Sequence, residues 1–521
     1  MGVFQNNLMG AAAAAASAGG SAFYDHQITQ SVRLGDTGYL KRTPSSAGNR
    51  ATWTFSTWIK LTNLGINSNA DQSGAILNAG TSGNQDGFYR LNYETTKLFS
   101  SSAEANFFFS TGVYRDTSAW YHVVWKQGGG TATVYVNGVA APGATASVSG
   151  NTAVNNNVIH CIGGASNSLG EKPLKGYLAE TIMIDGTALG PDSFGEEKNG
   201  VWIPKDASGL TFGTNGFHLD YASSSDLGND VSGNNNDWTS VNLAASDKTL
   251  DSPTFNSDSN GGNWNTLNAI DLNSADAGLS DGGLTLTTTS SNRRSAFGTM
   301  GVSTGKWYFE SRQINDTASN NYPLGIQRIS EGLQWKNWTH YIGSAVSTYD
   351  YSYAMYNKGA GDTSEKVYND VWTTLTTSSA GVAGTIFQMA FDLDAGKIWF
   401  GINNTWTNSG NPSTAANPVF TSLASGTYAT ALSISLSGSH DYFTHNYGQD
   451  GTFAGTLTGG AIGTETDATG YGAFKYEPPT DFLALCAGNL PTADAIDPAQ
   501  TDDDYPQKLF NTKLYTGTGS S

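Results

Sequence analysis

Charged residues, cysteine and long hydrophobic runs are all scarce in this sequence of 521 residues. Asp, Glu, Lys and Arg make up only 13% of the chain, against roughly a quarter in an average globular protein. The two cysteines, Cys161 and Cys486, lie far apart in the sequence, which excludes a disulfide framework and a thiolate metal cluster. No stretch approaches about eighteen apolar residues, so we expect no membrane insertion.

Basic clusters are missing as well. Asp and Glu total 44 against 26 Lys and Arg, which gives a net charge of −18. A protein that binds nucleic acid or an anionic membrane presents a basic patch that neutralises phosphates. We therefore expect neither as a partner. The run Ala11 to Ala16 has no Lys or Arg before it and fits a secretory signal poorly.

Aromatic residues, by contrast, are plentiful and are spaced as in β-strands. The 13 Trp, 24 Tyr and 23 Phe can fill more than one hydrophobic core. They alternate with β-branched residues between turns rich in Gly, Asn, Asp and Ser, and helical periodicity is nearly absent. The clearest predicted strands are Thr52 to Leu61, Trp120 to Lys126, Thr131 to Asn137, Tyr177 to Asp185, Gly305 to Gln313, Tyr322 to Gln327, Gly384 to Asp392, Lys397 to Ile402 and Thr430 to Leu436. One short helical turn is expected at Pro191 to Glu197.

The length and the strand pattern predict an all-β chain with two β-sandwich (jelly-roll) domains in tandem behind a short N-terminal arm. The expected parts are an arm at 1–22, a sandwich at 23–206, a polar connection at 207–262, a second sandwich at 263–490 and a C-terminal tail at 491–521. The arm is either a disordered end or a segment that orders only against a neighbouring subunit. The tail is either a further edge strand or a docking segment.

The first block carries a specific order of motifs. WYHVVWKQGGGTATVYVNGV (Trp120 to Val139) is a strand, a glycine turn and a second strand that ends in Asn137-Gly138, a pair that favours a tight turn. IHCIGG (Ile159 to Gly164) and KGYLAETIMIDGTAL (Lys175 to Leu189) follow. In this order the motifs resemble the laminin-G-like, concanavalin A-like jelly-roll family over about residues 23–205.

The second block contains GKWYFE (Gly305 to Glu310), MAFDLDAGKIWFGINN (Met389 to Asn404) and the closing YEPPTDFLALC (Tyr476 to Cys486). With these motifs it resembles a SPRY-type β-sandwich over about residues 263–490. It implies that Asp392 to Gly396 form the hairpin turn between two core strands. YSYAMYN (Tyr351 to Asn357) occupies the place of an aromatic strand of that family.

Three further segments are MGVFQNNLMGAA at the start, YLKRTPSSAGNRATWTFSTWIK (Tyr39 to Lys60) and YTGTG near the end. Together with the order of the two blocks, they are similar to virion-associated proteins of tailed phages, notably marine and cyanobacterial ones. The resemblance implies a tail-fibre or appendage subunit, a homo-oligomer with a trimer favoured, that binds host cell-surface glycan and other virion subunits. Such a protein would be located in the virion, which assembles in the host cytoplasm. The alternative is a purely structural head-decoration or connector protein that binds no sugar.

A glycan-degrading enzyme is the third reading, because the concanavalin A-like fold also includes glycanases. These need two carboxylates across the scissile bond, often as Glu-x-Asp-x-x-Glu, and that spacing is absent. Glu180 and Asp185 are five positions apart on one strand, so we expect them on opposite faces. His122, between large apolar residues, either points to solvent or has a hydrogen-bond partner. We predict no catalysis and no nucleotide cofactor.

Oxygen side chains recur at every second position in one segment of the polar connection. The residues are Asp230, Ser232, Asn234 and Asn236, followed by Asp237. Calcium prefers such ligands, so Ca²⁺ is the one metal that the sequence offers. The early glycine and the missing distal Glu favour instead an ordinary turn rich in Asx residues.

A sugar site in a lectin-like sandwich needs an aromatic ring to stack on and amides or carboxylates to bind hydroxyls. Trp335, Asn337, Trp338, His340 and Tyr341 supply both kinds of group. The spacing of the tryptophans suits a loop, and part of the tyrosine run downstream belongs to the core if the SPRY resemblance holds. In the first block, Asn155 to Asn157 and Ser166 to Gly170 are either ligand-binding loops or plain turns.

Overall fold

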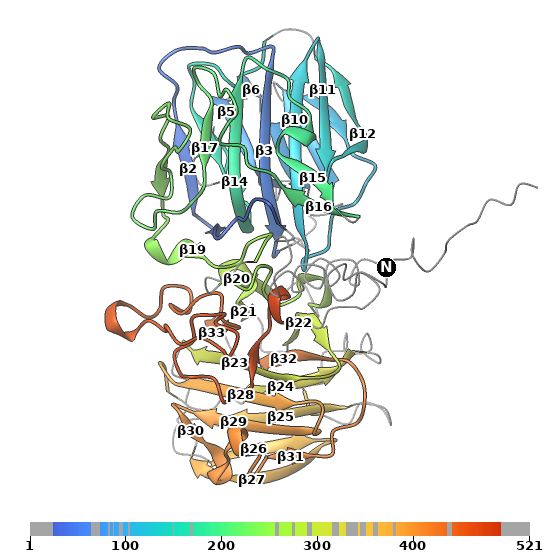
Figure 1. Ribbon diagram of the computed structural model, residues 1–521, viewed down its shortest axis with the longest axis vertical. Coiled ribbons are helices and arrows are strands. Elements are labelled where there is room, and N and C mark those ends of the chain that lie inside the picture. Colours follow the sequence, from blue (N-terminus) through green and yellow to red (C-terminus); the bar gives the residue numbers. More distant parts are fainter. Residues whose placement is uncertain are drawn as a thin grey trace, which may run out of the picture.

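The computed structural model shows an all-β chain of two sandwiches stacked along the long axis of the molecule (Figure 1). Helical geometry in the described residues is limited to short 3₁₀ turns, among them Pro191–Ser193, where the sequence predicts a turn. None of these helices is long and apolar enough to cross a membrane. The structure describes residues 24–63, 73–81, 84–86, 88–92, 97–102, 105–148, 151–166, 169, 171–198, 200–255, 260–272, 277–288, 294–314, 322–329, 342–343, 351–357, 363–378, 382–434 and 440–490.

The first sandwich is built on an eight-stranded sheet. Along the sheet its strands are β12 (Val139–Ser147), β11 (Thr131–Val136), β10 (Trp120–Gly128), β3 (Trp53–Leu61), β14 (Gly176–Asp185), β1 (Ser31–Leu34) and β19 (Lys248–Thr249), and β17 (Phe217–Leu219) also pairs with β14. The five-stranded sheet opposite contains β18 (Thr239–Val241), β2 (Tyr39–Arg42), β13 (His160–Ile162), β5 (Leu77–Thr81) and β6 (Asn84–Asp86). Trp53, Phe55 and Trp125 are fully buried in the core that includes residues of both sheets.

Two smaller units complete this sandwich. A four-stranded sheet contains β4 (Ser73–Ala75), β7 (Phe88–Asn92), β8 (Lys97–Ser102) and β9 (Ala105–Phe109). A hairpin of β15 (Gly195–Lys198) and β16 (Val201–Pro204) places Trp202 against the eight-stranded sheet, where it packs with Trp58 and Trp120. The large sheet therefore buries residues on both faces.

The second sandwich pairs a nine-stranded sheet with a six-stranded one. The larger sheet contains β20 (Ala277–Ser280), β21 (Thr285–Thr288), β33 (His440–Asn446), β23 (Lys306–Gln313), β28 (Ile386–Asp392), β29 (Lys397–Ile402), β30 (Thr405–Trp406), β31 (Phe420–Thr421) and β34 (Leu483–Ala484). The smaller contains β22 (Arg294–Val302), β32 (Tyr428–Ile434), β24 (Tyr322–Arg328), β25 (Ser352–Asn357), β26 (Thr363–Tyr368) and β27 (Val371–Ser378). Trp264, Trp307 and Trp399 lie in one continuous core.

The all-β fold and all the strands singled out in the sequence are confirmed, with ends that differ by no more than two residues. The segment 207–262, expected as a polar connection, is placed differently. It contributes β17, β18 and β19 to the two sheets of the first sandwich. Because each of these strands is only two or three residues long and is surrounded by polar turns, it leaves almost no hydrophobic pattern in the sequence. The arm and the tail, 1–22 and 491–521, lie outside the described residues.

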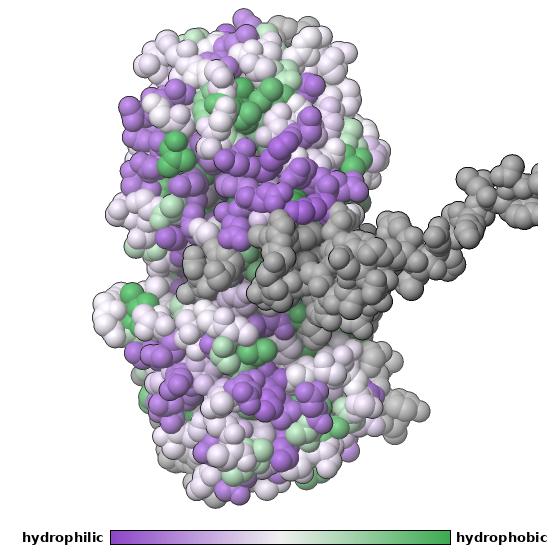
Figure 2. All heavy atoms as spheres, viewed as in Figure 1, coloured by the Kyte–Doolittle hydropathy of each residue, from purple (hydrophilic) through white to green (hydrophobic). Residues whose placement is uncertain are grey.

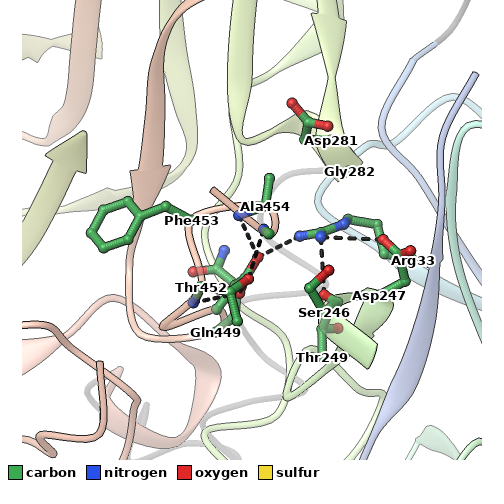
Figure 3. Close-up of polar contacts among 12 residues, drawn as sticks. Arg33, Ser246, Asp247, Thr249, Asp281, Gly282, Gln449, Thr452, Phe453 and Ala454 are labelled. Carbon is green, nitrogen blue, oxygen red and sulfur yellow. Dashed lines mark hydrogen bonds and ion pairs between the residues drawn. The ribbon is translucent and has the colours of Figure 1, made fainter. Parts of the chain in front are cut away.

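The two sandwiches meet through buried charged groups. Arg33 of β1 is 3% exposed and donates to Asp450 Oδ2 at 2.5 Å, to Ser246 O at 3.0 Å and to Asp247 Oδ1 at 3.3 Å. Figure 3 shows its guanidinium between Ser246 and Asp247 on one side and the loop around Thr452 on the other. Asp450 follows β33 of the second sandwich, so this contact joins the two units directly.

A second buried cation lies in the same junction. Lys60 Nζ of β3 donates to Asp251 Oδ2 at 2.6 Å, to Asn263 Oδ1 at 2.7 Å and to the Trp264 carbonyl at 2.7 Å. Asp251 also accepts from Trp120 Nε1 at 2.9 Å. Burial lowers the pKa of Lys60 and raises that of Asp251, while the attraction between them opposes both shifts. Every strong donor and acceptor here has a partner, as a buried ion pair requires.

Candidate binding pocket

A polar loop at residues 226–238 ends at Trp238, which lines a pocket in the first sandwich. Asp230 organises this loop. Its Oδ1 accepts from His218 N at 2.8 Å and Ser232 N at 2.9 Å, and its Oδ2 from Ser232 Oγ at 2.9 Å and Asn236 N at 2.8 Å. Asp237 Oδ1 accepts from Asp230 N at 2.9 Å. These are the contacts of successive Asx turns, in which side-chain oxygens bind nearby N–H groups.

The asparagines of the loop are also engaged. Asn234 Nδ2 donates to the carbonyls of Gly213 and Gly216, at 2.8 and 3.0 Å. Asn236 Nδ2 donates to Thr214 O at 2.9 Å and Gly216 O at 2.8 Å, and Asn236 Oδ1 accepts from the Arg42 guanidinium. The structure thus brings all the predicted calcium ligands into one loop, where the carboxylates of Asp230 and Asp237 accept from N–H and O–H donors. Across the described residues there is no group of three or more His, Cys, Asp or Glu that could hold a metal ion. Calcium binding stays a prediction.

The loop positions two side chains of the pocket, Trp238 and Arg42. The Trp238 ring packs edge to face on Phe217 with centroids 5.0 Å apart, and Trp238 N donates to Gly228 O at 2.8 Å. Arg42 of β2 donates to Asn215 O at 3.3 Å and to Asn236. Burial lowers the pKa of Arg42, while the charges of Asp230 and Asp237 oppose that shift. The guanidinium is therefore held in place before any ligand arrives.

The pocket lies where the two sheets meet the end of this loop and is small, with room for about one water molecule. Its polar lining consists of Arg42, Asn155, His160, Asn215 and Trp238. Its apolar lining consists of Pro44, Leu77, Val154, Met183 and Phe217. Asn155 is 2% exposed and Trp238 is 3% exposed. Within the described part of the chain, Asn155 Oδ1 and Trp238 Nε1 have no hydrogen-bond partner. Two lining residues thus have one unpaired acceptor and one unpaired donor.

Asn155 is fixed by the rest of its own hydrogen bonds. Its backbone N donates to His160 Nε2 at 3.0 Å, and its Nδ2 donates to Asn49 O at 3.0 Å and Asp185 Oδ1 at 2.5 Å. Burial lowers the pKa of His160 to about 4. The imidazole is therefore neutral at pH 7, and its Nδ1, 2.8 Å from Val158 O, carries the proton. Because both the backbone and the amide nitrogen are anchored, Asn155 Oδ1 keeps one orientation.

Sequence reasoning identified only part of this pocket. It included Asn155 in a candidate loop, and its candidate metal loop, Asp230 to Asp237, ends directly before Trp238. It missed Arg42, His160 and Trp238, which come from distant segments. A tryptophan directly after an Asx-rich turn was the available signal for Trp238.

The candidate carboxylates of the enzyme hypothesis share no partner. Glu180 Oε1 lies 2.5 Å from His26 Nε2, and this contact raises the pKa of His26. Asp185 instead accepts from Asn49 N at 2.7 Å and Asn215 N at 3.0 Å. A bulge in β14 between Ala179 and Ile182, where Glu180 has φ 41°, separates the two environments. These two carboxylates do not flank a common space.

His122 is buried and has hydrogen-bond partners, which is the second of the two expected arrangements. Its ring stacks on Trp58 at 4.7 Å and on Trp202 at 6.0 Å. Ser56 Oγ lies 2.8 Å from its Nε2, and Trp202 Nε1 donates to its Nδ1 at 2.9 Å. Burial lowers the pKa of His122 to about 3, so it is a neutral part of the sheet surface under the hairpin of β15 and β16.

The predicted sugar-binding residues of the second block, Trp335, Asn337, Trp338, His340 and Tyr341, lie outside the described residues. Two tyrosines downstream are described. Tyr353 is a core residue, 4% exposed and stacked on Tyr368 at 4.7 Å, while the Tyr351 ring lies 3.9 Å from the Arg328 guanidinium. Part of the tyrosine run is therefore core, as expected from the SPRY resemblance.

Residues 34–193 match the family model of the concanavalin A-like lectin/glucanases superfamily. The first sandwich is therefore a lectin-like jelly-roll domain, which confirms the prediction for that block. Its fold is consistent with glycan binding and favours binding over catalysis. No curated protein sequence matches the chain significantly.

Solved structures similar to the chain include two SPRY domains, the kind of domain predicted for the second block. The SPRY domain of human HERC1 is 16% identical, with 32% of this chain and 89% of that chain covered and a TM-score of 0.24. The TRIM65 PSpry domain is 16% identical over 35% and 91% of the two chains, with a TM-score of 0.25. A candidate carbohydrate-binding protein from Bacteroides ovatus is 17% identical over 41% and 58%, with a TM-score of 0.30.

Proposed function

We propose that this chain is a surface protein of a bacteriophage particle, a tail-fibre or appendage subunit that attaches the particle to glycan on the host cell. The observation that carries the proposal is a concanavalin A-like sandwich with a pocket where a buried donor and a buried acceptor are unpaired. The phage setting is supported by the resemblance of the segment Tyr39 to Lys60 and of both chain ends to virion-associated proteins.

A binding role without catalysis accords with the chemistry of the described residues. Glu180 and Asp185 have separate partners, and the buried histidines His122 and His160 stay neutral at physiological pH. Figure 2 shows a face where polar residues predominate and hydrophobic ones occur in small separate patches.

The assembly expected from this function is a homo-oligomer, with a trimer favoured, joined to other virion subunits. We place it in the virion, which assembles in the host cytoplasm. Mass photometry of the purified full-length chain should give about three times the 54.8 kDa of one chain. A strictly monomeric chain at micromolar concentration would contradict the trimer.

Competition for host cells tests the attachment role. Purified full-length chain is added to host cells before particles whose genome encodes it, and free particles are counted after adsorption. We expect the chain to lower adsorption and to bind a subset of sugars on a glycan array. Particles that contain the chain, together with unchanged adsorption and an empty array, would instead establish the purely structural decoration or connector role. Particles that lack the chain would refute the virion assignment.

A further inference from the structure

We propose that Lys60 and Asn263 become covalently joined by an amide bond that forms between their side chains once the chain has folded. The bond lies at the junction of the two sandwiches and is independent of the proposed attachment to glycan. Three buried or half-buried groups meet there, the amine of Lys60, the carboxylate of Asp251 and the carboxamide of Asn263. The ion pair of Lys60 and Asp251 is the state before this reaction.

The strand register encloses the Lys60 side chain among aromatic residues. Lys60 of β3 lies opposite Trp120 of β10 and Tyr177 of β14, so the three side chains share one face of the sheet. The two aromatic rings have centroids 6.4 Å apart, and Lys60 Nζ is 5.8 Å from the Tyr177 ring. Lys60 and Asp251 have no exposed surface. The amine is therefore removed from water, the condition that activates a lysine as a nucleophile.

The hydrogen bond between Lys60 and Asn263 brings the amine close to the carboxamide carbon. Lys60 Nζ lies 2.7 Å from Asn263 Oδ1, and a C=O bond is about 1.23 Å long, so Asn263 Cγ is within about 4 Å of Nζ. Atoms poised to react are about 3–3.5 Å apart, a distance that a small rotation of the carboxamide provides. On its other side the carboxamide is held by Ser118, whose carbonyl accepts from Asn263 Nδ2 at 2.6 Å.

Asp251 is placed to transfer the protons. Its Oδ2 lies 2.6 Å from Lys60 Nζ, so the carboxylate takes a proton from the ammonium and leaves a neutral amine. Burial favours this transfer, because it lowers the pKa of Lys60 and raises that of Asp251. The Trp120 indole N–H, 2.9 Å from Asp251 Oδ1, holds the carboxyl group in this position.

The reaction needs no further reagent. The neutral amine attacks Asn263 Cγ, a C–N bond forms, and the carbonyl electron pair moves to Oδ1. Asp251 then takes a second proton from Nζ as it gives the first to Nδ2. The carbonyl re-forms, the Cγ–Nδ2 bond breaks, and ammonia leaves. A secondary amide and a protonated Asp251 remain, so the costly buried ion pair is removed. Asn263 is half-buried, which gives the ammonia a route to solvent.

The bond would connect the two sandwiches covalently at a second place. Lys60 lies in β3 of the first sandwich, and Asn263 directly precedes Trp264, a core residue of the second. The two joined residues are 203 positions apart. A covalent link there would resist separation of the sandwiches under force or in denaturant, which hydrogen bonds alone do not.

Intact mass spectrometry of the purified full-length chain tests the proposal. We expect the chain to be lighter than its sequence by one ammonia, once removal of Met1 is taken into account. Trypsin does not cleave after a lysine whose amine is part of an amide. Digestion should therefore give a branched peptide in which residues 51–90 and 249–293 are joined through Lys60 and Asn263.

Three variants locate the reaction. Lys60→Arg keeps a positive charge but has no amine, and Asp251→Asn has no carboxylate to take the proton, so both should have the full mass of their sequences. Lys175→Met, at an exposed lysine that pairs with Asp36, is the control and should lose ammonia as the unmodified chain does. Melting temperatures show which variants fold.

An unmodified chain with the full mass of its sequence would overturn the proposal. A loss of ammonia without the branched peptide, or an equal loss in Lys60→Arg, would overturn it too, because an Asn-Gly pair such as Asn137-Gly138 also loses ammonia when it cyclises to a succinimide. Full loss of ammonia in folded Asp251→Asn would overturn the role of Asp251. If Lys60→Arg fails to fold, the branched peptide of the unmodified chain decides.

Discussion

Glu310 is a carboxyl group with no exposed surface in β23 of the second sandwich. It accepts from Lys475 N and Tyr476 N, each at 2.8 Å, and from the Tyr308 hydroxyl at 2.9 Å. Despite these donors, burial raises its pKa from 4.5 to about 7. Glu310 thus holds the closing segment, which includes Lys475 and Tyr476, against β23. Because its pKa is raised, its contribution to the stability of the fold depends on pH.

Glu310→Gln should flatten the pH dependence of folding. Below about pH 4.5 the carboxyl is protonated in the folded and the unfolded chain, and its contribution is fully present. As the pH rises towards 7 the unfolded chain loses the proton first, so the contribution is lost. A shift to about 7 corresponds to about 3 kcal/mol across this window. Denaturant titrations at pH 4.5, 6 and 7.5 measure it, with the exposed Glu197→Gln as control. If the unfolding free energy changed with pH equally in Glu310→Gln and in the unmodified chain, the titration of Glu310 would be disproved.

Individual residues also show which features can be predicted from the sequence and which cannot. Asn137 and Gly138 were recognisable as a tight turn, because their preference for positive φ is local. They adopt φ 48° and 79°. Asn155 and Trp238 could not be predicted as neighbours, because nothing local indicates that the chain returns to the same pocket after 82 intervening residues. The orphaned atoms that define the site are a property of the packed fold.

At the scale of elements, long strands were predictable and short ones were not. β3, β10 and β14 each have nine or ten residues and contain aromatic or β-branched residues that the alternation reveals. β17, β18 and β19 have two or three residues, and only pairing with β14, β2 and β1 makes them strands. For this reason the first sandwich extends beyond residue 206, the end expected from the sequence.

Gly138→Ala tests how the turn between β11 and β12 supports the hairpin of β15 and β16, which covers the eight-stranded sheet. A Cβ at Gly138 would lie 2.3 Å from Cζ3 of Trp202, which stacks on His122. Gly129 is the control, because it also has a positive φ, 61°, but no atom lies within 4 Å of its Cβ position. Positive φ alone costs about 1–2 kcal/mol with alanine, and overpacking adds about 1–3 kcal/mol. We expect the unfolding free energy, measured by denaturant titration, to fall about 1–3 kcal/mol further in Gly138→Ala than in Gly129→Ala. Equal losses in the two variants would show that Trp202 gives way freely.

At the scale of the whole molecule, the junction makes the two sandwiches one unit. Arg33 and Lys60 extend from adjacent parts of the first sandwich to Asp450, Asn263 and Trp264. Tyr177 Oη donates to the Gly282 carbonyl at 2.8 Å, and a Cβ at Gly282 would lie 2.3 Å from that hydroxyl. A joint with buried, paired charges and so close an approach keeps one geometry, since any tilt would leave charges unpaired.

Lys60→Met should uncouple the two sandwiches. Asp251, fully buried, would keep the N–H groups of Trp120 and Trp264 but lose its cation, and removing one member of a buried pair costs about 3–5 kcal/mol. The Asn263 side chain and the Trp264 carbonyl would lose their shared donor as well. In scanning calorimetry we expect one transition for the unmodified chain and two separate transitions for Lys60→Met.

Lys60→Met combined with Asp251→Asn should recover part of the loss, because no lone charge is then buried. Lys175→Met, which removes the exposed pair with Asp36, is the control and should shift stability by no more than about 1 kcal/mol. A single transition in Lys60→Met at the temperature of the control would show that the junction does not depend on this ion pair.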